Sequence, residues 1–131
     1  MSPTRLSTVV LDAPDAHELA AFYLRLLGYE VRTEEPHWVL IGPPPGTAGT
    51  ALSFQTEPAY VPPVWPTRHP GDQQMMLHLD IQVDDLGSET ARAVAEGAVL
   101  AAHQPQDDVR VLFDPAGHPF CLWAETAQEA Q

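Results

Sequence analysis

The order of apolar and polar positions predicts a strand, a helix and three further strands in the first half of the chain. Segment 6–11 is mostly β-branched or apolar and indicates a buried strand. Apolar residues then recur at helical spacing between Asp15, a typical N-cap, and Gly28, a typical helix end. Three short strands are expected at 29–33, 37–41 and 50–56.

The same order of elements is expected again in the second half. Residues 77–83 alternate between apolar and polar side chains, as a strand with one buried face does. Asp84 and Asp85 open a helix that ends near Gly97. Further strands are expected at about 98–103, 108–113 and 119–124.

The two halves are therefore interpreted as a repeat. Asp15 precedes Asp85 by seventy positions, and Gly28 precedes Gly97 by sixty-nine. The predicted organisation is one α+β domain over 1–131 with two βαβββ modules, one at about 6–57 and one at about 76–125. Five prolines in segment 58–75 predict a semi-rigid, extended linker between them.

Three segments carry a resemblance to a known family. Residues 15–28 (DAHELAAFYLRLLG) resemble the first helix of glyoxalase-like domains. Residues 63–85 resemble the linker and fifth strand of their actinobacterial branch, and residues 114–122 (DPAGHPFCL) resemble their last hairpin. The chain thus resembles the vicinal-oxygen-chelate superfamily of glyoxalases, bleomycin-resistance proteins and dioxygenases. The resemblance implies a cupped, partly open eight-stranded mixed sheet with helices on its convex side.

The amino-acid composition limits the classes of partner that we expect this chain to bind. Eighteen acidic residues against six arginines give a net charge of −12, which disfavours nucleic acid and anionic membranes. The same charge would favour a cationic ligand, although scattered acidic residues also serve solubility alone. The single cysteine excludes an internal disulfide and, with no signal-peptide core, suggests the cytoplasm. Unpaired edge strands lead us to expect a homodimer.

Strand alternation indicates which side chains face the cup. In 77–83 the leucines, Ile81 and Val83 form the helix side, which leaves His78 and Asp80 on the cup side. The linker tryptophan, Trp65, is expected near the mouth of the cup. The predicted ligand-binding residues are Ser53, Gln55, Trp65, His78, Asp80, Cys121 and Trp123.

The resemblance also implies four positions for metal ligands, and here they are Thr8, Ser53, His78 and Cys121. Hydroxyls compete poorly for a divalent ion, so only the last two are credible ligands. We therefore expect no metal cofactor. If a divalent metal is present, His78 and Glu57 are its expected ligands, and Gln55 or His69 could assist.

The leading functional hypothesis is a small-molecule binding protein that takes an aromatic or cationic ligand without a catalytic metal. The alternative is a metal-dependent lyase, isomerase or dioxygenase of the same superfamily, with its catalytic residues unassigned. A third is a partner module with a vestigial pocket. His78 could equally be a hydrogen-bonded structural histidine, and Cys121 a small buried apolar residue. The other histidines, at 17, 37, 103 and 118, are interpreted as surface or loop residues.

Overall fold

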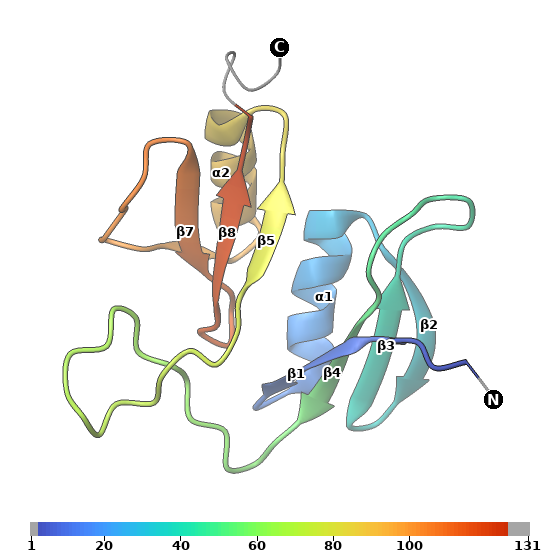
Figure 1. The fold of residues 1–131 in the computed structure, drawn as a ribbon. Coiled ribbons are helices and arrows are strands. Elements are labelled where there is room, and N and C mark those ends of the chain that lie inside the picture. Colours follow the sequence, from blue (N-terminus) through green and yellow to red (C-terminus); the bar gives the residue numbers. More distant parts are fainter. Residues whose placement is uncertain (1–2, 126–131) are drawn as a thin grey trace. The chain divides into compact units, whose positions relative to one another are not determined.

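The computed structural model describes residues 3–125. The chain divides into two compact units, Met1–Tyr60 and Val61–Gln131, which we call module 1 and module 2. Each contains one helix and a four-stranded mixed sheet. Figure 1 shows the helix of each unit beside the strands of its own sheet. The expected α+β class and the repeated βαβββ order are thereby confirmed. In the described residues, neither helix is long and apolar enough to cross a membrane.

Module 1 has its sheet in the order β1-β4-β3-β2. The β1–β4 pair is parallel, whereas β4, β3 and β2 are joined by antiparallel pairs. The first strand begins later than expected, because its pairing with β4 starts at Val9 opposite Leu52. The elements are β1 (Val9–Ala13), α1 (Ala16–Leu27), β2 (Glu30–Glu35), β3 (Trp38–Gly42) and β4 (Leu52–Thr56).

The ends of α1 follow the local sequence. The Asp15 side chain accepts hydrogen bonds from the backbone N–H groups of His17 and Glu18, which satisfies two of the free donors at the helix start. Gly28 ends the helix with φ of 69°, a left-handed conformation that favours glycine. The buried face of α1 packs on the sheet, and the ring of Tyr23 stacks on that of Phe54 at a centroid distance of 5.7 Å.

Module 2 repeats this arrangement with the sheet order β5-β8-β7-β6. Asp85 caps its helix through the N–H of Ser88. The last helix-side residues of β8, Phe120 and Leu122, are fully buried. The elements are β5 (Leu79–Gln82), α2 (Leu86–Ala95), β6 (Val99–Leu100), β7 (Val109–Phe113) and β8 (Pro119–Trp123).

The strand expected at 98–103 is wrong in length, since β6 covers only two residues. The Gln104 side chain takes the place of further strand pairing. Its amide donates to the carbonyls of Ala101 and Val111, and its oxygen accepts from the Val111 N–H, each at 2.9 Å. A side chain thus supplies the hydrogen bonds that a longer β6 would have made.

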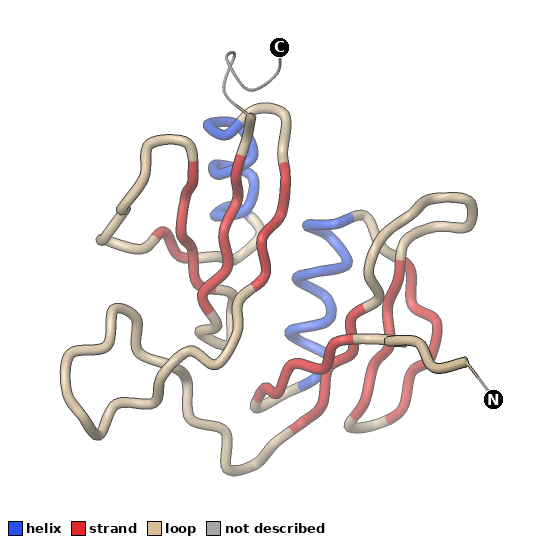
Figure 2. Tube along the Cα trace, in the orientation of Figure 1, coloured by secondary structure: helices blue, strands red, loops and turns tan. Residues whose placement is uncertain are grey.

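The linker is not extended throughout. Within the loop between β4 and β5 in Figure 2, residues 64–73 fold back, and the Val64 N–H donates to the Gln73 carbonyl at 2.8 Å. One carboxylate oxygen of Asp72 accepts from the N–H groups of Arg68 and His69 at 3.1 and 3.0 Å. Residues 64–73 therefore form a closed loop held by these hydrogen bonds instead of an extended spacer.

Candidate functional site

Within the described residues of module 2, the sheet has one face toward α2 and a second face on which this module places no helix, and we call the second the open face. Leu79 and Ile81 alternate with the more exposed Asp80 and Gln82 along β5. In the parallel β5–β8 pair, Asp80 lies opposite Cys121 and Gln82 opposite Trp123. The predicted alternation is confirmed for these strands, and it places the four polar or aromatic side chains on the open face.

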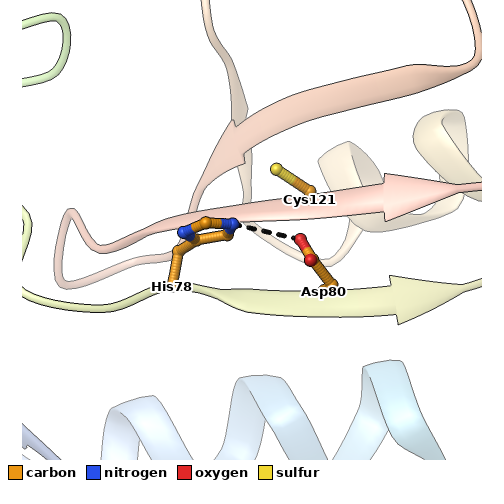
Figure 3. A group of neighbouring side chains, drawn as sticks. All are labelled: His78, Asp80 and Cys121. Carbon is orange, nitrogen blue, oxygen red and sulfur yellow. Dashed lines mark ion pairs between the residues drawn. The ribbon is translucent and has the colours of Figure 1, made fainter.

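Three side chains with different donor atoms meet on the open face (Figure 3). The Nε2 atom of His78 lies 3.2 Å from Oδ1 of Asp80. One nitrogen of His78, one oxygen of Asp80 and the Sγ atom of Cys121 all lie within 4.8 Å of one another. The side chains of His78 and Asp80 are 40% and 60% exposed, so this triad is open to solutes.

The thiol of the triad is held in its protonated form. Burial raises the pKa of Cys121 to about 11, and the Asp80 carboxylate adds to the rise by its charge and by accepting a hydrogen bond from the thiol. Asp80 therefore contacts both other members of the triad. At neutral pH the thiol is a weak donor and a poor nucleophile, since the thiolate is the reactive form.

Module 1 has a different set of side chains at the equivalent positions. The β1–β4 register places Val10 opposite Ser53, as β5–β8 places Asp80 opposite Cys121. The hydroxyl oxygens of Thr8 and Ser53 lie 2.9 Å apart in a hydrogen bond, and Ser53 is fully buried. This hydroxyl pair is satisfied internally, and no ionisable group accompanies it at Val10.

The other predicted site residues divide between the modules. Gln55 is exposed on β4 of module 1, and the Glu57 carboxylate accepts the Ala59 N–H at 3.0 Å in the turn that follows. Trp65 belongs to module 2, where its half-buried ring faces that of His103 at 5.5 Å. Trp123 ends β8 on the open face.

Besides His78, two histidines of module 2 have structural partners that the sequence reasoning missed. His118 places Nδ1 at 2.9 Å from Oδ2 of Asp114, a buried carboxylate that also accepts two backbone N–H groups in the β7–β8 turn. The turn role of Asp114 is confirmed, but its pairing with His118 was not expected. His103 lies in the β6–β7 connection, more than thirty residues from Trp65 in the sequence, and its ring contacts the Trp65 ring at an interplanar angle of 40°. Only the four-residue spacing of Asp114 and His118 gave any signal in the sequence.

Comparison of the sequence with protein families identifies one family. Residues 8–123 match the family model described as a glyoxalase-like domain. Among curated proteins, none matches the chain.

Solved structures with this fold have varied functions. A glyoxalase/bleomycin resistance protein/dioxygenase family enzyme from Burkholderia phytofirmans PsJN is 20% identical, with a TM-score of 0.67 over 92% of this chain and 98% of its own. TnmS3, an antibiotic binding protein from Streptomyces sp. CB03234, is 19% identical, with a TM-score of 0.62 over 96% and 99%. The fosfomycin resistance protein FosX from Listeria monocytogenes is 17% identical, with a TM-score of 0.68 over 99% and 100%. A FosX mutant was solved with Mn(II) and a dihydroxypropylphosphonic acid. At these identities the likeness supports the fold alone.

Proposed function

Since the chain belongs to the glyoxalase-like domain family, we propose that it is a small-molecule binding protein whose ligand lies on the open face of module 2. The observation that carries the proposal is the exposed Asp80 carboxylate between His78 and Cys121. Module 1 offers only a self-satisfied hydroxyl pair at the equivalent positions. The chemistry that would recognise a ligand is therefore concentrated in one module.

The proposed class of ligand follows from the negative charge of Asp80 and the aromatic ring of Trp123 on the open face. Asp80 supplies a negative charge, and the net charge of −12 attracts cations over a longer range. Trp123, two residues along β8 from Cys121, supplies an aromatic surface for stacking and cation–π contact. We propose an aromatic, cationic ligand. A binding function is compatible with this fold, since TnmS3, which has the same fold, is an antibiotic binding protein.

The remaining predicted contacts contribute in different ways. Gln55 is exposed and carries an amide that forms hydrogen bonds, and Trp65 presents a half-buried ring on the 64–73 loop. We keep Trp65, which belongs to module 2, as a proposed ligand contact, whereas Gln55 is an exposed amide of module 1 outside this site. Ser53 is buried with its hydroxyl bonded to Thr8, so its part is to shape the surface of module 1 rather than to bind directly.

A thermal-shift series tests the proposal. The three probes are an aromatic amine cation, the neutral aromatic of the same size and the corresponding aromatic acid. A ligand at a hundred times its Kd stabilises the folded state by about 2.7 kcal/mol. For a chain of this size the melting temperature then rises by roughly 5–10 °C. The cation should stabilise most, and added salt should weaken its effect.

The variant Asp80→Asn separates the charge argument from the site itself. It should remove the preference for the cation while leaving a response to the neutral aromatic. Asp84→Asn, an exposed carboxylate outside the triad, is the matched control and should change nothing. Stabilisation by the acid alone would overturn the charge argument, and the absence of any shift would overturn the binding function.

A metal-dependent lyase, isomerase or dioxygenase is the second candidate, and the convergence of three donor side chains favours it. The donor set, however, does not resemble the oxygen-rich environment that suits Mn(II). Thr8 and Ser53 are engaged with each other, and Glu57 is engaged with the Ala59 N–H. Turnover that requires added metal and is lost in His78→Ala would establish this candidate over the first.

We also propose a homodimer in the cytoplasm. The edge strands of the module 2 sheet are β5 and β6, and the apolar side chains of Leu77 and Val99 are 51% and 62% exposed. Exposed edges and apolar side chains favour association between copies. One unpaired cysteine suits a reducing compartment. Sedimentation at tens of micromolar should give twice the 14.3 kDa chain mass, and a clean monomer would contradict the dimer.

A further inference from the structure

The loop between Val64 and Gln73 is closed by hydrogen bonds within itself. The Val64 N–H donates to the Gln73 carbonyl at 2.8 Å, so the two ends of the loop meet. The Asp72 carboxylate accepts the N–H groups of residues 68–69, which holds the tip of the loop. Because these bonds join parts of the same loop, the loop can move as one unit about its ends.

A ring contact joins this loop to the β6–β7 connection of the same module. The half-buried ring of Trp65 lies against the ring of His103, with centroids 5.5 Å apart. Figure 1 shows the loop, in light green, near the orange β6–β7 connection. His103 is exposed, but the next residue, Gln104, is fixed by three hydrogen bonds of 2.9 Å to Ala101 and Val111. The ring on the loop therefore meets a ring on a fixed support.

The strength of this contact depends on the charge of His103. Histidine is the side chain whose charge ordinarily changes between pH 5 and 8. A cation within about 6 Å of the centroid of a tryptophan ring is attracted to the face of that ring. The 5.5 Å separation meets this condition, so a protonated His103 should bind Trp65 more tightly than a neutral one. At an exposed position the gain corresponds to roughly two- to fivefold in an equilibrium.

Other charged groups lie on the two segments that carry these rings. Arg110 donates from one nitrogen to the carbonyls of Gln106, Asp107 and Val109. Carboxylates and guanidinium groups ordinarily keep their charge between pH 5 and 8, so His69 is the other group here whose charge changes in that interval. A test of His103 therefore needs His69 as its control. The charged and titratable groups are Arg68, His69 and Asp72 on the loop and Asp107, Asp108 and Arg110 on the connection.

We propose that residues 64–73 form a lid that closes by the contact of Trp65 with His103, and that protonation of His103 holds the lid closed. The link to the ligand rests on the proposed function, because Trp65 is a proposed ligand contact. In the closed lid the ring is half-buried against His103, whereas an open lid presents it to a ligand. Affinity for an aromatic cation should therefore follow the population of the open lid and fall as the pH is lowered.

Trypsin cleavage at Arg68 measures how often the lid opens, since the protease acts on the open form. Wild type and His103→Gln are compared at the same pH, so the pH dependence of trypsin itself cancels. The ratio of variant to wild-type cleavage rate should be about two- to fivefold larger at about pH 5.5 than at about pH 8. A ratio that does not change with pH would overturn the role of His103 protonation.

A second substitution identifies the Trp65 ring as the partner. Trp65→Ala should be cleaved at Arg68 faster than the wild type. Adding His103→Gln to Trp65→Ala should change the rate no further, because the contact needs both rings. Independent, multiplying effects of the two substitutions would overturn the contact as the closing element. Circular dichroism checks that each variant folds.

Nuclear magnetic resonance observes the contact without a protease. The indole N–H signal of Trp65 is assigned by its loss in Trp65→Phe. It should shift with pH between about pH 5 and 8 in the wild type and in His69→Gln, but not in His103→Gln. A shift that persists in His103→Gln and disappears in His69→Gln would overturn the assignment to His103.

The lid and the ligand site can fail separately. Between about pH 5.5 and 8, affinity for the aromatic amine cation should rise about two- to fivefold more in the wild type than in His103→Gln. The same rise in both proteins would overturn the link between lid and ligand and leave the proposed function standing. A lid that behaves as expected in cleavage and resonance, with no response to any organic probe, would support the lid and contradict the proposed function.

Discussion

Asp80 lies opposite Cys121 in the parallel pairing of β5 and β8, and its carboxylate accepts a hydrogen bond from the Cys121 thiol. The same carboxylate lies 3.2 Å from the His78 ring. One acidic side chain thus links the two groups that the sequence identified as credible metal ligands. A substitution at Asp80 should therefore change the chemistry of both.

Removing the Asp80 charge should make the thiol more reactive. Burial is the largest cause of the raised Cys121 pKa and persists in Asp80→Asn, but the charge and the carboxylate hydrogen bond are lost. The pKa should fall below about 11, because the thiolate is no longer opposed by a neighbouring negative charge. Alkylation by iodoacetamide, followed against pH, should show an earlier rise than in the wild type. An unchanged profile would mean that burial alone sets the reactivity.

The same thiol should make the fold sensitive to alkaline pH. Burial in the folded state raises its pKa from the ordinary 9.0 to about 11, so the protonated form is favoured in the folded state. The stabilisation is complete below pH 9, and it is lost as the pH rises from 9 to about 11. Urea unfolding at a series of pH values should show this loss in the wild type and a smaller one in Cys121→Ser. Equal losses in both would assign the effect to other groups.

The Trp123 ring should contribute directly to ligand affinity. Trp123→Ala removes the aromatic surface beside the triad, and we expect a loss of about 1–3 kcal/mol, or roughly 5- to 150-fold in Kd. Trp123→Phe keeps a ring and should recover much of the affinity. Calorimetric titration with the best aromatic cation measures both. Equal losses in the two variants would indicate a structural role for Trp123 rather than ring contact.

The buried Asp114 should stabilise module 2. Its carboxylate accepts the N–H groups of Ala116 and His118 and contacts the His118 ring. Asp114→Asn replaces one acceptor oxygen with a donor in a buried turn, at a cost of about 2–4 kcal/mol in the free energy of unfolding. Asp107→Asn, an exposed carboxylate in the β6–β7 connection, is the control. Matching urea midpoints for the two variants would contradict this role.

The closed loop at 64–73 should depend on Asp72. Asp72→Ala removes the acceptor for the N–H groups of Arg68 and His69, so the loop should open more often. Limited trypsin digestion at Arg68 should then be at least about fivefold faster, since cleavage follows the population of the open form. The chain has few competing sites, with six arginines and no lysine. Identical cleavage rates would show that the prolines hold the loop without Asp72.

Local features were predictable from the sequence, and long-range ones were less so. The helix ends at Asp15 and Gly28 were found because capping depends on adjacent residues. Alternation along β5 and β8 likewise identified the side chains of the open face. The role of Gln104 was missed, because no pattern distinguishes a side chain that replaces strand pairing from one in solvent.

The sequence analysis predicted the members of the candidate site on one face, but it also included Ser53 and Gln55 of module 1. His78, Asp80 and Cys121 were each predicted as site residues, but Asp80 lies outside the four ligand positions that the resemblance implies, which are Thr8, Ser53, His78 and Cys121. The contact of Trp65 with His103 depends on how the linker folds back, which the prolines alone did not reveal. Register between strands decides such groupings, and it is a property of the whole sheet.

The hydroxyl pair of Thr8 and Ser53 occupies the positions in module 1 that correspond to His78 and Cys121, and it can be replaced by protein engineering. Both modules have the same strand order and the same register at these positions, but only module 2 carries reactive side chains there. Transplanting the triad as Thr8→His, Val10→Asp and Ser53→Cys would ask whether backbone geometry is enough to create a second reactive centre. In such a variant, module 1 would carry the transplanted triad and module 2 would keep the natural triad, so the two could be compared within one chain.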